Sequence, residues 1–156
     1  MDSSRPPREN RPRLGLPLWA LLLLAALALP RVVVHDLGID VGGLVTALLA
    51  LVPPAVWVVV ALRARVPSPV TTLVVVGALY GIGLGLGHNL MWDSVFEDEP
   101  QLSGSLDGEL PAAAEEILMR SATFGSSVFT GAVVGLVAGL VASGIRRLGR
   151  SDGARR

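Results

Sequence analysis

The stretch "VTTLVVVGALYGIGLGLGHNLMW", residues 70–92, decides the fold of this chain. It contains no Asp, Glu, Lys or Arg. A helix needs ~20 apolar residues to cross ~30 Å of hydrocarbon, and this stretch is long enough. Backbone inside lipid must satisfy its own hydrogen bonds, so the stretch predicts a transmembrane α-helix. Trp92 at its end is typical of the membrane–water interface.

Three further blocks of the chain are equally apolar. The full sequence is 51% hydrophobic and 17% charged, with the apolar residues gathered into long runs. Such runs are typical of a membrane protein. We therefore predict an all-α integral membrane protein, with four transmembrane helices in an antiparallel bundle. The predicted spans are 14–34, 42–62, 70–92 and 123–145. Together they form a membrane domain, 14–145, which includes an outer acidic loop, 93–122.

The arginines predict how the chain is threaded. All 13 basic residues are Arg, and eleven of them fall in the two tails, 1–13 and 146–156, or in the connection between the second and third spans. Because positive residues favour the cytoplasmic side, both termini are predicted to be cytoplasmic. The absence of lysine and the high content of Ala, Gly, Val and Leu indicate a GC-rich bacterial genome, so the predicted location is a bacterial inner (plasma) membrane. Only Arg31 and Arg120 fall on the outer side. An alternative is that the first span is a cleaved secretory signal, with Ala26-Leu27-Ala28 as the cleavage site.

Small residues recur every four positions in the third and fourth spans. Such ladders allow helix backbones to approach closely in lipid, as in a glycine zipper. Two interpretations stay open: the two spans pack as a hairpin, or one ladder faces outward and forms a homo-oligomer. Gly83, offset by two, is predicted to face lipid. The predicted packing residues are Gly77, Gly81, Gly85, Ser127, Gly131, Gly135, Gly139 and Ser143.

A candidate polar site lies at the outer ends of these two spans. His88 follows Gly81 by seven residues, nearly two helical turns, so it shares the glycine face and is expected near Thr123 or Ser127. It is either a hydrogen-bonded interface histidine or a proton or ligand site. Glu116 and Arg120 are spaced for an i,i+4 pair, and we expect no contact between His88 and Glu116. The candidate residues are His88, Asn89, Asp93, Glu115, Glu116 and Arg120.

Two prolines, Pro53 and Pro54, lie in the middle of the second span. A proline inside a helix removes one hydrogen bond and clashes with the preceding turn. The pair predicts a kink or local unwinding near Leu49–Pro54. Broken helices line ion sites in some transporters, so this feature favours an alternative function as a small oligomeric transporter or channel subunit.

Residues 115–120 read EExxxR. This resembles the first motif of the CAAX-protease and bacteriocin-processing family of intramembrane metalloproteases. The resemblance implies that Glu115 and Glu116 would help to activate a water for peptide hydrolysis. The family also has later histidine-containing motifs, and no histidine follows Arg120 here. A degenerate metalloprotease-like protein is therefore a distant alternative.

The chain has no cysteine, which excludes disulfides and zinc–thiolate sites. We predict a protein that is not an enzyme, has no cofactor or metal, and serves as an accessory or assembly protein packing through glycine-rich helix faces. The expected partners are the lipid bilayer and either a second copy of the chain or another membrane protein. We expect no nucleic acid partner.

Overall fold

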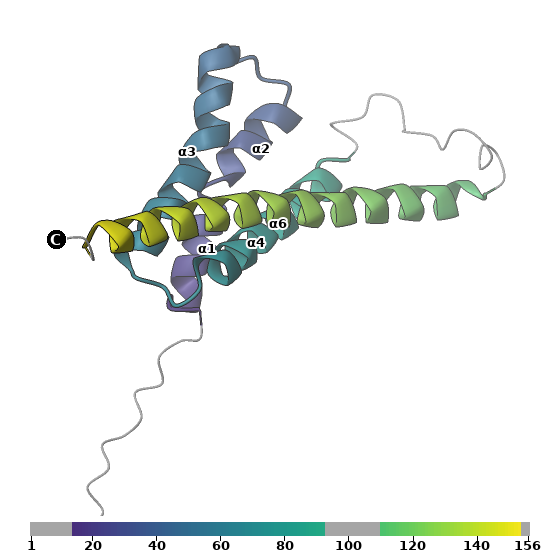
Figure 1. The fold of residues 1–156 in the computed structure, drawn as a ribbon. Coiled ribbons are helices and arrows are strands. Elements are labelled where there is room, and N and C mark those ends of the chain that lie inside the picture. Colours follow the sequence, from purple (N-terminus) through teal and green to yellow (C-terminus); the bar gives the residue numbers. More distant parts are fainter. Residues whose placement is uncertain (1–13, 93–109, 154–156) are drawn as a thin grey trace, which may run out of the picture.

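A computed structural model of the chain describes residues 14–92 and 110–153. These residues fold into helices without strands. Candidate residue Asp93 and most of the acidic loop lie outside the described residues. The helices are α1 (Leu18–Ala26), α2 (Leu29–Asp36), α3 (Gly42–Arg63), α4 (Pro69–Leu90) and α6 (Ala112–Gly153) (Figure 1).

Three helices, α3, α4 and α6, are long and apolar enough to cross a membrane. α3 and α4 match the predicted spans 42–62 and 70–92 to within two residues at each end. α6 begins at Ala112 instead of Thr123 and has 42 residues. At 1.5 Å per residue it is about 63 Å long, well beyond the ~30 Å of a bilayer core. Part of α6 must therefore extend past the hydrocarbon if the helix crosses a membrane.

The first predicted span, 14–34, is not a single helix. α1 ends at Ala26 and α2 begins at Leu29. Pro30 explains the break: it has no N–H to donate to the Ala26 carbonyl, and its ring clashes with the preceding turn. The N–H of Ala28 bonds to Ala25 O at 3.2 Å, a tighter i,i+3 turn than an α-helix makes.

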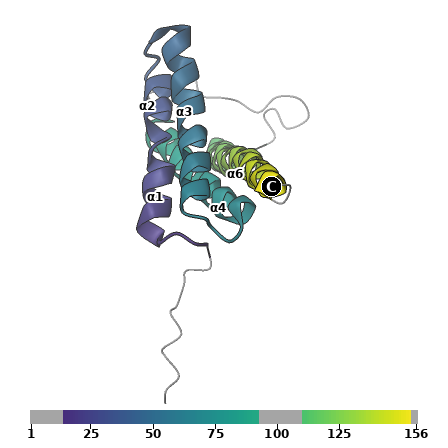
Figure 2. The same ribbon diagram turned by 60° about the vertical axis from the view of Figure 1, so that its left-hand side comes forward.

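The helices form two layers that cross. α4 and α6 lie side by side as an antiparallel hairpin, whereas α1, α2 and α3 run steeply across them (Figures 1 and 2). The expected bundle of near-antiparallel helices is thus present for α4 and α6 but not for all the helices. The crossing brings α2 and α3 against the hairpin at different points along its length.

The hairpin is closely packed because glycines of one helix face backbone of the other. A Cβ atom on Gly81 would lie 2.5 Å from Ser127 O, far inside van der Waals contact. Gly77 lies against the backbone of Gly131 and Gly135 in the same way. Any larger side chain at these positions must push the two helices apart. Of the two arrangements left open by the sequence, the structure has the hairpin.

Gly83 does not face outward as expected. A Cβ atom there would lie 2.9 Å from Cδ2 of Leu29 in α2. The prediction was wrong because α2 crosses α4 on the side opposite the hairpin contact, and helical spacing within α4 cannot reveal that neighbour. A glycine with open space around it is found instead on α6, at Gly144.

α3 continues through both of its prolines without interruption. The local unwinding expected near Leu49–Pro54 is therefore absent, while a bend remains a prediction. Pro53 is buried against the rest of the molecule, as is Trp57 one turn later. Packing of this face holds the helix together across a point where backbone hydrogen bonds are lost.

Side-chain hydrogen bonds join the chain at one end of the hairpin. Thr72 Oγ1 donates to Leu14 O at 2.8 Å, and Arg146 Nη1 donates to Val66 O at 2.8 Å. The start of the described chain, the α3–α4 connection and the C-terminal part of α6 therefore meet. Asn89 and Arg120 meet at the opposite end.

Candidate functional site

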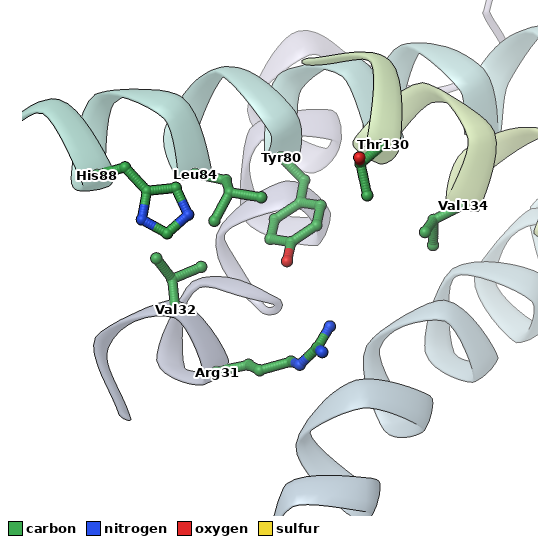
Figure 3. Close-up of a pocket in the computed structure, with 7 residues that line it drawn as sticks. All are labelled: Arg31, Val32, Tyr80, Leu84, His88, Thr130 and Val134. Atoms are coloured by element: carbon green, nitrogen blue, oxygen red, sulfur yellow. The ribbon is translucent and has the colours of Figure 1, made fainter. Parts of the chain in front are cut away.

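A cavity of about 220 Å³ lies between α2, α4 and α6. Figure 3 shows side chains from all three helices around it. Its lining is formed by Arg31, Val32, Tyr80, Leu84, His88, Thr130 and Val134.

Helical spacing explains why these side chains converge. Tyr80, Leu84 and His88 are four residues apart on α4, so they form one row along the helix. Thr130 and Val134 are spaced in the same way on α6. The break between α1 and α2 turns the chain so that Arg31 and Val32 approach this row (Figure 3).

The cavity has apolar walls and a few polar groups. Val32, Leu84 and Val134 are apolar, while the guanidinium of Arg31, the imidazole of His88 and the hydroxyls of Tyr80 and Thr130 are polar. Tyr80 is 7% exposed and makes an edge-to-face contact with Trp57, with ring centroids 6.2 Å apart. This contact fixes the tyrosine ring as a rigid wall of the cavity.

Arg31 differs from the other polar groups in the cavity. It is exposed, and no described residue accepts a hydrogen bond or forms an ion pair with its guanidinium. Asp40 shares a second cavity of about 200 Å³ with it, but Asp40 Oδ1 accepts from the N–H of Gly42 at 2.9 Å. The positive charge of Arg31 thus lies beside an accessible cavity without a counter-ion among the described residues.

His88 is half-buried and lies where the sequence placed it. It lines a neighbouring cavity together with Thr123 and Ser127, the two residues expected near it. Ser127 is buried, and its hydroxyl donates to Thr123 O at 2.8 Å. The imidazole therefore reaches the part of α6 around Thr123 and Ser127, and His88 lines two cavities.

Three of the other candidate residues, Asn89, Glu116 and Arg120, form a separate contact with Trp92, and we call these four residues the Arg120 latch. Arg120 Nη1 donates to Asn89 O at 3.0 Å, and Arg120 Nε lies 2.8 Å from Glu116 Oε1. The guanidinium also stacks over Trp92, 4.9 Å from the ring centroid. The predicted i,i+4 pair is present within α6, and the contacts of Arg120 with Asn89 and Trp92 tie α6 to the end of α4. Asn89 Nδ2 in turn donates to Gly85 O at 2.8 Å.

Comparison of the chain with protein-family models, curated proteins and solved structures finds no match. Glu115 and Glu116 of the EExxxR motif lie in the first turns of α6, with Glu116 engaged by Arg120. Among the side chains that the structure describes, no group of three His, Asp or Glu residues is arranged to hold a metal ion.

Of the polar residues that line the cavity, sequence reasoning missed Arg31, Tyr80 and Thr130. Tyr80 could have been found from its position eight residues before His88 on the same face of the helix. Arg31 was used only to count charges, although it directly follows the helix-breaking Pro30. Thr130 lies within one turn of Ser127, which the sequence did place near His88. The cavity therefore has hydrogen-bond donors beside apolar walls, an arrangement that suits the binding of a small ligand.

Proposed function

We propose that the chain is a four-span protein of the bacterial plasma membrane, with both termini cytoplasmic, that acts as a non-catalytic accessory or assembly protein. The observation that carries this proposal is the outward surface of α3. Within that helix the buried residues are Pro53, Trp57 and Ala61. Leu44 is 75% exposed and Leu51 69% exposed. Such a surface requires acyl chains or another apolar helix against it.

The hairpin supports an assembly role for α3. The glycine faces of α4 and α6 already contact each other, so they are occupied within one copy of the chain. A partner helix must therefore use another surface. α3 presents large apolar side chains over its outward face, and it is anchored to the hairpin on its inner side. Assembly through α3 would leave the hairpin unchanged.

A photo-crosslinking amino acid placed at Leu44 or Leu51 tests this proposal in intact membranes. We expect a discrete protein adduct from both positions. If the partner is a second copy of the chain, the adduct should have twice the mass of one chain. Leu140 on α6, 57% exposed, is the matched control and should crosslink only to lipid. An assembly role is contradicted if α3 and α6 positions give the same lipid-only pattern.

The alternative, a small oligomeric transporter or channel subunit, has one observation in its favour. Pro53 and Pro54 cannot donate to the carbonyls of Leu49 and Ala50, four residues earlier. Leu49 lines the cavity of about 200 Å³ that also contains Asp40 and Thr46. This alternative predicts cation flux into liposomes containing the purified protein, reduced by the double change Pro53→Ala, Pro54→Ala. Absence of flux in tightly sealed liposomes would reject it.

A further inference from the structure

We propose that the cavity between α2, α4 and α6 binds the headgroup of an anionic phospholipid, with the lipid phosphate on Arg31. The inference rests on the membrane location proposed above but not on the assembly role. Three kinds of group surround one cavity: an arginine that has no counter-ion among the described residues, two side chains with hydroxyl groups, and an apolar wall.

The depth of the cavity fits a headgroup. His88 precedes Trp92 by one helical turn, or about 6 Å along the axis. A tryptophan at the end of a span lies at the membrane interface. Figure 3 shows the Arg31 side chain reaching from α2 toward Tyr80, away from His88. Arg31 also lines a second cavity with Gly38 and Asp40 of the connection between α2 and α3, so its guanidinium is within reach of the headgroup layer. An arginine at this depth is stabilised when it reaches the interface and finds an anion there.

Comparison with Arg120 shows why the anion must come from outside. Arg120 bonds to Asn89 O, pairs with Glu116 and stacks on Trp92. Arg31 has no such contact among the described residues. At headgroup depth the abundant anion is lipid phosphate. The planar guanidinium binds phosphate through two parallel N–H···O bonds, which are stronger than neutral hydrogen bonds.

The remaining lining suits the other parts of a phospholipid. The hydroxyls of Tyr80 and Thr130 lie on the same cavity as Arg31 and match the phosphate and glycerol oxygens. Val32, Leu84 and Val134 provide an apolar wall for the first methylenes of an acyl chain. A volume of about 220 Å³ is below the ~300 Å³ at which pockets for whole ligands begin. The cavity therefore holds a headgroup, and the acyl chains continue into the bilayer.

Native mass spectrometry of the full chain, released from detergent micelles, tests the proposal. The probes are phosphatidylglycerol, which is anionic, and phosphatidylcholine, which is zwitterionic. We expect the wild type to retain phosphatidylglycerol about tenfold more strongly, because the choline ammonium of phosphatidylcholine offsets the charge of its own phosphate and is repelled by Arg31. Arg31→Gln should remove this preference. Arg147→Gln, which removes an exposed arginine of α6, should keep it to within about twofold.

Two further measurements test the shape of the cavity and the source of the phosphate. Val134→Phe fills the cavity without changing its charge, and it should also abolish the preference. Soluble glycerol phosphate should not displace the bound lipid, and displacement at millimolar concentration would identify a free phosphate as the ligand and overturn the lipid assignment. Equal retention of the two lipids by the wild type, or unchanged preference in Arg31→Gln, would also overturn it.

Membrane insertion is measured separately by alkaline carbonate extraction. A chain that resists extraction but shows no lipid preference refutes this inference alone. A chain that is extracted refutes the proposed membrane location and the inference with it.

Discussion

Trp57 of α3 donates a hydrogen bond from its indole Nε1 to the carbonyl oxygen of Leu24 in α1, at 2.7 Å. That carbonyl would normally accept from the N–H of Ala28, one turn later in a helix. Here Ala28 N–H bonds to Ala25 O instead, because the chain turns between α1 and α2. A side chain of α3 thus satisfies a backbone group freed by the break, and Trp57 itself is 0% exposed.

The change Trp57→Phe should therefore destabilise the fold. It removes the donor and leaves the Leu24 carbonyl buried without its partner, which costs about 1–3 kcal/mol. The measurement is the unfolding equilibrium in mixed micelles with increasing dodecyl sulfate. Trp19→Phe is the matched control, since Trp19 is 66% exposed, and it should cost under about 0.5 kcal/mol. Similar losses in the two variants would show that the hydrogen bond contributes nothing.

A methyl group added to Gly81 should have the opposite effect from one added to Gly144. Gly81→Ala places Cβ 2.5 Å from Ser127 O, so the hairpin must open, at a cost of about 1–3 kcal/mol. Gly144→Ala meets nothing within 4 Å and should be neutral or stabilising by up to about 1 kcal/mol, because alanine favours the helix. The same unfolding assay measures both. A close hairpin contact is refuted if Gly81→Ala is as stable as Gly144→Ala.

The central helices α3 and α4 follow directly from the sequence, because a long uncharged run leaves the backbone no alternative to a helix in lipid. The break at residues 27–28 does not, since hydropathy adds up side chains and ignores the missing N–H of Pro30. The predicted fourth span, 123–145, does not include the extension of α6 back to Ala112. The charged first turns of α6 lower the hydropathy without lowering the helix propensity.

The candidate site was only partly predictable for a related reason. His88 was found because its distance from Gly81 is fixed by the helical repeat within one element. Arg31 reaches the cavity from α2, so the crossing of the two layers sets its position, whereas Thr130 lies on α6 within the hairpin. That crossing arises from side-chain packing between elements distant in the sequence. Gly83 was wrongly assigned to lipid for the same reason.

The Arg120 latch predicts unequal effects for its two charged members. Arg120→Gln removes the bond to Asn89 O, the stacking on Trp92 and the ion pair, and should cost about 1–2 kcal/mol. Glu116→Gln removes only an exposed i,i+4 pair, worth about 0.3–0.5 kcal/mol. Unfolding midpoints of both variants, measured at low and high salt, check the difference. Equal midpoints would mean that the latch adds nothing beyond the surface ion pair.

The last prediction concerns the side of the membrane on which each end of the chain lies. The arginine distribution favours four spans, whereas the break in the first span leaves three helices that are each long enough to cross a membrane. The chain has no cysteine, so single cysteines report their own positions. With four spans, Ser4→Cys and Ser151→Cys should react with an impermeant thiol reagent only after cell lysis, and Ser105→Cys in intact cells. If α1 and α2 together fail to cross the membrane, Ser4→Cys moves to the side opposite Ser151→Cys.

The contacts at one end of the hairpin favour the four-span result. Thr72 binds Leu14 O and Arg146 binds Val66 O, so the beginning of α1 and the end of α6 are held at the same level of the molecule. The labelling also distinguishes a cleaved signal, because cleavage would remove the Ser4→Cys label from the membrane-bound chain and leave the other two. Labelling of Ser4→Cys and Ser105→Cys from the same side would contradict four spans, whatever the orientation of the rest.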